Sequence, residues 1–248
     1  MSDPKPHIVL IPGLWVGPKV YSDVSSNLQS QNYTTTTIPL RSTGCRSPGN
    51  PSMHDDEEFI RSKLVQLIET EQKDIVMVMH SAGGFLGTAA VKDLSKKTRS
   101  ERGMKGGVVG YVFLSAAFVE VGYEHVDPPF FVVNNDTGET HCIDPKSTLF
   151  NDMDEESTAK WIKELRCQPA KGWGLTTEYA GFRDAPSVYL ICEKDECVPF
   201  EWQTKLATLA GSRMERCAAG HMPMLSMPEK VVEVIIGAAK EFGLSPSA

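Results

Sequence analysis

The sequence predicts an α/β protein whose mostly parallel sheet is covered by helices. Short runs of consecutive apolar residues, such as Ile75 to Met79, are typical of strands buried on both faces. These runs alternate with stretches of helical periodicity in the order β-α-β-α-β-α-β, which favours parallel strands joined by helices. A chain of 248 residues is long enough for one large α/β domain or two small ones.

The first half of the chain contains four expected strands and three expected helices. Pro18 begins the first helix, and four acidic residues from Asp55 to Glu58, which suit the helix dipole, form the first turn of the second. The third helix is expected over 85–97. The strands are expected at residues 7–11, 33–38, 75–79 and 108–114.

The regular alternation stops between Glu120 and Gly181. Residues 130–133 and 140–143 flank a turn and are expected to pair as a hairpin. Asp152 to Glu155 resembles a capping box that begins a helix through Leu165. Ligands of parallel sheets bind at the carboxyl ends of the strands, so we interpret this insert as a cap over that edge. The predicted organisation is a core of residues 1–119 and 182–248, with a cap of residues 120–181.

The alternation resumes after the insert. Strands are expected at 187–192 and 214–217, and helices at 200–209 and 229–242. The loop 218–221 follows the last strand and ends in His221.

The strand 75–79 leads directly into His80-Ser81-Ala82-Gly83-Gly84 and then a helix. A serine on a tight strand-to-helix turn is typical of a nucleophile elbow, whose next backbone N–H, here on Ala82, points to where an oxyanion forms. The glycines allow strand and helix to approach closely. The chain departs from the G-x-S-x-G pattern at position 79, where it has Met79.

A serine nucleophile needs a base, and the base needs an orienting acid. In folds of this type the order along the chain is serine, acid, histidine, each on a loop after a strand. His221 has that position, whereas His80 is expected to point away from the serine and to pack. Three acids precede it in one loop: Glu193, Asp195 and Glu196.

Composition excludes several other classes of function. The net charge of −7 argues against a nucleic-acid partner, and no apolar run approaches 18 residues, so no membrane span is expected. The first residues lack the plan of a signal peptide, which predicts a cytoplasmic protein. The six cysteines are scattered, so we expect free thiols and no metal site.

Four segments carry a resemblance to a known family, and it extends from His7 to Gly243. The chain resembles the α/β-hydrolase superfamily, in the branch of small, lidded esterases and lactonases that includes plant methyl-ester esterases and hydroxynitrile lyases. The segments are residues 11–15 (Ile-Pro-Gly-Leu-Trp), 80–84, 192–199 and 220–225. Residues 149–152 and 177–181 of the cap are similar to uncharacterised fungal and bacterial members.

The resemblance implies a role for each site residue. Ser81 would be the nucleophile, His221 the base, and Asp195, four residues before Pro199, the acid. The backbone N–H groups of Leu14 and Ala82 would form the oxyanion hole.

Large side chains near these segments are candidates for the substrate pocket. Trp15 would line one side of the pocket, and aromatic residues of the cap would cover it. Met222, which directly follows His221, is a further candidate. At strand or helix spacing such residues are as well explained by core packing. The cap residues are Phe130, Phe131, Trp161 and Trp173.

The function expected from the resemblance is hydrolysis of a small carboxylic ester or lactone through an acyl-enzyme, without a cofactor. Relatives that act on haloalkanes or epoxides have aspartate at the elbow, and hydroxynitrile lyases have lysine where this chain has Met222. Two alternatives stay open: a lyase or cyclase that uses the same triad for proton transfer, and a lidded receptor with little turnover, which Met79 favours. The partner is a small molecule, and a homodimer is compatible with the sequence.

Overall fold

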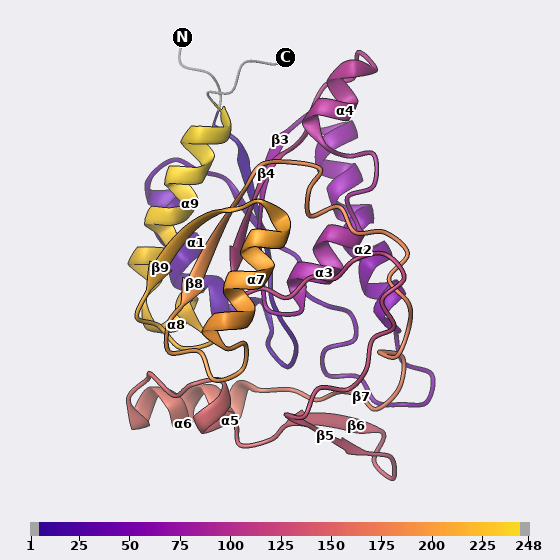
Figure 1. Cartoon of the computed structure of the whole chain (residues 1–248), viewed down its shortest axis with the longest axis vertical. Coiled ribbons are helices and arrows are strands. Elements are labelled where there is room, and N and C mark those ends of the chain that lie inside the picture. Colours follow the sequence, from indigo (N-terminus) through magenta and orange to yellow (C-terminus); the bar gives the residue numbers. More distant parts are fainter. Residues whose placement is uncertain (1–4, 244–248) are drawn as a thin grey trace.

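The computed structural model describes residues 5–243, and its centre is a six-stranded sheet in the order β2-β1-β3-β4-β8-β9 (Figure 1). Every pair of neighbouring strands is parallel, which confirms the predicted fold class. The strands are β1 (His7–Ile11), β2 (Thr35–Thr37), β3 (Asp74–His80), β4 (Gly107–Leu114), β8 (Ser187–Cys192) and β9 (Arg213–Cys217).

Helices cover both faces of the sheet (Figure 1). On one face, α1 (Ser22–Ser30) and α9 (Pro228–Gly243) share an apolar cluster with Val76 and Val78 of β3. On the other face, the cluster contains Met77 and Met79 of the same strand. Because alternate residues of β3 enter two separate cores, the strand is apolar throughout. The helices of this second face are α2 (Met53–Val65), α3 (Gly83–Ala89) and α7 (Phe200–Ala210).

Strand order determines which loops meet at the centre. Strand β3 lies between β1 and β4, and Met79 is level with Ile11 on one side and Phe113 on the other. The loops that follow these three strands therefore leave the sheet side by side. Beyond β4 the sheet continues with β8 and then β9. Strand β8 precedes Asp195 in the chain, and β9 precedes His221.

The predicted helix over 85–97 is wrong. Helix α3 ends at Ala89, and a separate helix, α4 (Lys96–Glu101), begins after a turn. Asp93 has a left-handed φ of 64°, which ends helical geometry. The Ser95 side chain then accepts a hydrogen bond from Thr98 N and begins α4.

Two other helices differ from expectation at their ends. The chain after Pro18 first forms a 3₁₀ turn, η1 (Pro18–Tyr21), before α1. The acidic helix α2 begins at Met53, because Ser52 and Asp55 form a capping box, and it ends in a π turn, η2 (Gln66–Thr70).

Residues 120–181, which we call the cap segment, lie across the carboxyl edge of the sheet (Figure 1). Strands β5 (Phe131–Asn134), β6 (Glu139–Cys142) and β7 (Gln168–Pro169) form a small antiparallel sheet that contains the predicted hairpin. The helices are α5 (Pro145–Thr148) and α6 (Glu155–Glu164). Asp154, not Asp152, caps α6, because its carboxylate accepts a hydrogen bond from Ser157 N at 2.8 Å.

Within residues 5–243 no helix combines the length and the apolar character that a membrane crossing requires. All six cysteines are free thiols. Cys192 and Cys217 are register partners on the neighbouring strands β8 and β9, with their sulfur atoms 4.0 Å apart.

Candidate active site

Ser81 lies between β3 and α3 with a left-handed φ of 51°. This backbone conformation is costly for a residue other than glycine and must be held by its surroundings. Ser81 N donates to Leu114 O at 3.4 Å, and Ser81 O accepts from Gly84 N and Ala117 N, each at 3.0 Å. The last residue of β4, the loop that follows it and the first turn of α3 thus fix the elbow.

Glycines allow three segments to converge at this serine. A Cβ on Gly83 would lie 2.7 Å from Pro12 O, and one on Gly84 would overlap the carbonyl oxygen of Ala117. A Cβ on Gly13 would lie 2.7 Å from the Ser81 Cβ. These positions have no room for a side chain.

Met79 occupies the position where the elbow pattern has glycine, and its side chain is accommodated by a different glycine. Met79 is fully buried, and a Cβ on Gly87 of α3 would lie 2.5 Å from its sulfur. Gly87 thus leaves the space that Met79 fills, one turn further along the helix. The tight turn at Ser81 is formed with the methionine in place.

We expect Gly87→Ala to destabilise the protein by about 1–3 kcal/mol, because the added methyl group overpacks the site against Met79. Met79→Ala destabilises by itself, because it empties a fully buried site, but it also removes the obstructing sulfur, so we expect the double variant to lose less than the sum of the two single variants. Urea unfolding of the two single variants and the double variant measures this coupling. Additive effects would contradict the pairing of the two positions.

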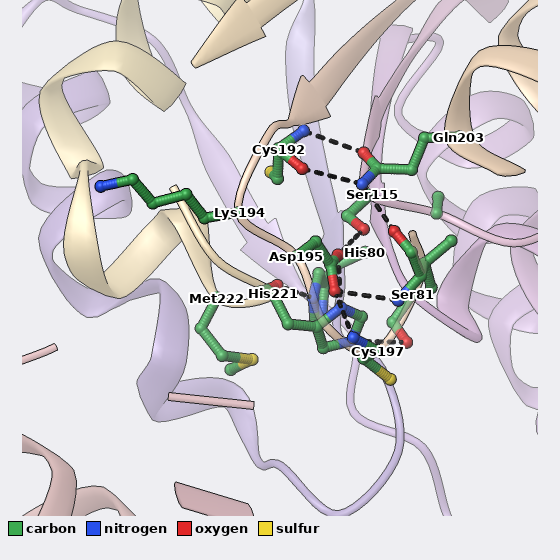
Figure 2. Close-up of polar contacts among 12 residues, drawn as sticks. His80, Ser81, Ser115, Cys192, Lys194, Asp195, Cys197, Gln203, His221 and Met222 are labelled. Atoms are coloured by element: carbon green, nitrogen blue, oxygen red, sulfur yellow. Dashed lines mark hydrogen bonds and ion pairs between the residues drawn. The ribbon is translucent and has the colours of Figure 1, made fainter. Parts of the chain in front are cut away.

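The structure brings Ser81, His221 and Asp195 into one hydrogen-bonded line (Figure 2). His221 Nδ1 lies 2.8 Å from Asp195 Oδ2, and Nε2 lies 3.1 Å from Ser81 Oγ. Because a carboxylate only accepts, Nδ1 carries the proton and Nε2 is free to accept from the serine hydroxyl. This is the arrangement that activates a serine for nucleophilic attack.

Of the three acids in residues 193–198, which we call the acid loop, only Asp195 contacts His221 within residues 5–243. Its Oδ1 accepts hydrogen bonds from Cys197 N at 2.7 Å and Val198 N at 2.9 Å, and its Oδ2 accepts from the hydroxyl of Ser115. Glu193 and Glu196 are exposed. The loop therefore turns one carboxylate inward and leaves two in solvent.

Electrostatics favour the charged form of both partners. Burial by itself lowers the pKa of His221, but the Asp195 carboxylate outweighs it and holds that pKa well above the usual value. Burial by itself raises the pKa of Asp195, but the charge of His221 and the hydrogen bonds from His221, Ser115 and Val198 outweigh it, and the pKa is lowered. Asp195 is thus ionised, and His221 readily accepts a proton.

Two buried residues that sequence reasoning missed support Asp195. Ser115 directly follows β4 with a φ of 41° and donates to the carboxylate. Gln203 of α7 binds both ends of the acid loop: it accepts from Cys192 N at 2.9 Å, and donates to Cys192 O at 2.9 Å and Val198 O at 2.7 Å (Figure 2). The position of Ser115 at the end of a strand was the one available signal, and Gln203 had none.

We expect Ser115→Ala to lower kcat/KM by about tenfold, because a hydrogen bond to a charged group contributes about 1.5–3 kcal/mol. Steady-state kinetics on an ester substrate measures the effect. Ser187→Ala is the matched control, since that buried hydroxyl bonds Ser212, away from the triad. Equal losses in the two variants would contradict a specific role for Ser115.

His80 is buried, as expected of a packing residue, and it lies beside His221, with which it makes a directed bond. The two ring centroids are 4.8 Å apart, and His80 Nε2 donates to the backbone carbonyl of His221 at 2.8 Å. Burial, and then the charge of His221, lower the pKa of His80 to about 3, so the ring is neutral. Its Nδ1 is buried and has no partner within residues 5–243.

The loop after β1 faces the elbow. Neither Leu14 N nor Ala82 N donates to a main-chain acceptor within residues 5–243, so both are available to a ligand. Trp15, with a φ of 64°, connects this loop to the cap segment: its indole N–H donates to Thr140 O at 3.2 Å. Its ring packs edge-on against Phe131 and Phe130, with centroids 5.1 and 6.2 Å away.

The other proposed pocket residues divide between two apolar clusters. Trp161 lines a cavity of about 190 Å³ together with Lys19 and Arg166. Met222 is buried in the cluster under α1 and α9, whereas Trp173 is buried in the cluster on the opposite face of the sheet. Trp15, Phe130, Phe131 and Trp161 belong to the same cluster as Met222 or pack against it, whereas Trp173 does not, and the roles of all six in substrate binding stay predictions.

Comparison with known proteins places the chain in a family. Residues 8–234 match the model of the alpha/beta hydrolase family. The chain is 32% identical over 249 residues to alpha/beta hydrolase nvfD of Aspergillus novofumigatus, covering 96% of this chain and 98% of that one.

Two solved structures share the fold. Polyneuridine aldehyde esterase superimposes with a TM-score of 0.74 at 18% identity, covering 95% of this chain and 100% of that one. A methylesterase from Arabidopsis gives 0.71 at 18% identity, covering 95% and 99%. The family match, the full-length relative and the shared fold agree with one another, and the chain belongs to the alpha/beta hydrolase family.

Proposed function

We propose that this hydrolase cleaves a small carboxylic ester or lactone through an acyl-enzyme on Ser81. The observation that carries the proposal is the unbroken line of hydrogen bonds from Ser81 through His221 to a buried Asp195. The esterase among the structural neighbours and the methylesterase of Arabidopsis support the choice of substrate class.

The geometry translates into two half-reactions. Ser81 Oγ attacks the carbonyl carbon while His221 Nε2 takes its proton, and Asp195 stabilises the resulting imidazolium. The N–H groups of Leu14 and Ala82 bind the oxyanion. The intermediate collapses, His221 returns the proton to the leaving alkoxide, and the alcohol departs. Water then adds to the acyl-enzyme by the same steps and releases the acid and the serine hydroxyl.

The packing of Met79 bears on the receptor alternative. That alternative needs a methionine that crowds the elbow, whereas the Met79 side chain reaches Gly87 on α3. We therefore favour turnover over simple binding.

The raised pKa of His221 predicts the acid limb of the pH profile. A protonated His221 cannot accept the Ser81 proton, so kcat/KM falls as the pH drops through the pKa of the free enzyme. Since Asp195 holds that pKa above 6.5, we expect half-maximal kcat/KM on the acid side above pH 6.5. Initial rates on an ester whose hydrolysis involves no ionisation of its own measure this limb. A half-maximal point below pH 6.5 would contradict the coupling of His221 to Asp195.

Labelling with a fluorophosphonate, followed by peptide mass spectrometry, tests the nucleophile. We expect a covalent adduct on Ser81 that is absent in His221→Ala. A folded wild-type protein that resists the label would overturn the acyl-enzyme.

A panel of aryl esters, methyl esters and lactones in ¹⁸O-labelled water then tests the reaction. Hydrolysis places one heavy oxygen in the product acid, because water releases the acyl group. A product without heavy oxygen would instead favour the lyase or cyclase alternative.

A further inference from the structure

Four residues of the cap segment, Leu149–Asp152, lie beside the triad, and we call them the anchor segment. Leu149 and Phe150 are almost completely buried, with 2% and 1% of their surface exposed. They belong to the same apolar cluster as Cys197 of the acid loop and Met222, which follows His221. Burial of two large apolar side chains fixes this part of the cap next to the catalytic loops.

The next residue, Asn151, contacts the acid loop. Its Nδ2 donates to the carbonyl oxygen of Lys194 at 2.7 Å, and Lys194 directly precedes Asp195. A carbonyl only accepts, so the amide presents its nitrogen to this bond.

Asn151 also lies against the loop that carries His221. Its Oδ1 is so close to Gly220 that a Cβ on this glycine would overlap it, and the Asp152 Oδ1 would lie 2.7 Å from the same Cβ. Gly220 directly precedes His221. The two loops are bonded to each other where Lys194 N donates to Ala219 O at 3.0 Å.

The core binds the acid loop at several points, including Glu193 N, which donates to Cys217 O at 2.9 Å, and Lys194 N, which donates to Ala219 O. Gln203 binds Cys192 before the loop and Val198 at its end. The carbonyl of Lys194, directly before Asp195, receives its side-chain bond from Asn151 of the cap. The backbone next to Asp195 is therefore held by the cap as well as by the core.

We propose that Asn151 is a positioning residue that keeps Asp195 and His221 aligned through the backbones of Lys194 and Gly220. The cap then completes the catalytic geometry in addition to covering it. The proposal rests on the proposed function of the triad, and acts on the backbone rather than on the substrate.

Asn151→Ala tests the proposal, and Asn134→Ala is the matched control. Asn151 is exposed, so we expect the alanine variant to fold. Asn134 belongs to the same cap segment, but among the residues that the structure describes its side chain accepts only from Asp136 N and Thr137 N of the hairpin turn. The readouts are the NMR titration of the His221 ring, the rate at which a small fluorophosphonate labels Ser81, and the thermal midpoint.

We expect the His221 pKa to fall in Asn151→Ala, since a displaced Asp195 stabilises the imidazolium less. Labelling slows by about tenfold, because small misplacements of catalytic groups are costly. Asn134→Ala changes neither readout. A lower thermal midpoint with unchanged titration of His221 would mean a purely structural role and overturn the proposal. If the wild type resists the label, the proposed hydrolysis fails, and the His221 titration still decides whether Asn151 positions the pair.

Discussion

Asp195→Asn is expected to lower kcat by about 10⁴-fold, because an amide in place of the carboxylate no longer stabilises the imidazolium or enforces the tautomer of His221. In the structure this carboxylate is buried and accepts four hydrogen bonds, from Cys197 N, Val198 N, Ser115 and His221. The amide nitrogen of asparagine would have to face at least one of these donors. Steady-state kinetics on the best ester of the panel, with circular dichroism to verify the fold, measures the loss.

The same loop contains its own controls. Glu193→Gln and Glu196→Gln remove a carboxylate two residues and one residue away, from exposed side chains. We expect kcat within about twofold of wild type for both, as for surface substitutions that break no network. A large loss of kcat in either glutamine variant, or a small loss in Asp195→Asn, would show that Asp195 is not the catalytic acid.

Gly13→Ala is expected to lower kcat/KM by about 100-fold, because misplacing a nucleophile by even 1 Å is that costly. A Cβ at this position would lie 2.7 Å from the Ser81 Cβ, 3.2 Å from its Oγ and 3.1 Å from His80 Nδ1. Either the serine or the loop that carries Leu14 N–H has to move. The oxyanion and the nucleophile are thus displaced relative to each other, which we expect to appear mainly in kcat.

Gly17→Ala, four residues later in the same loop, is the control. A Cβ there meets nothing within 4 Å, and the backbone has an ordinary φ of −92°. We expect its kinetics to match wild type. Equal activity of the two variants would show that the loop yields at Gly13 without cost.

The sequence predicted the parallel sheet because uninterrupted apolar strands such as β3 report burial on both faces directly. Chain order predicted that Ser81, the loop with three acids and His221 meet, because parallel strands place the residues after their carboxyl ends on one edge. The resemblance to the α/β-hydrolase superfamily then selected Asp195 among the three acids. Because the chain order of the elements does not depend on sequence distance, Ser81 and His221 could be paired across 140 positions.

The features that were missed depend on contacts that no local pattern records. The break of the helix after Ala89 follows from the turn at Asp93 and the cap at Ser95, within a stretch whose apolar period continues. Gln203 is polar on a helix of ordinary pattern, and its burial appears only once α7 packs against the acid loop. The pocket residues were selected for their size, which core packing explains equally well for Trp173 and Met222.

The pairing of Met79 with Gly87 has a consequence for the sequences of relatives. A large side chain at position 79 leaves no room for a side chain at position 87, so the two positions should vary together among relatives. Glycine at 79 would permit larger residues at 87, and methionine at 79 would not. A motif that demands glycine two residues before the serine then describes only one of two solutions. A search that accepts glycine at either position would recover chains with this elbow that the stricter pattern overlooks.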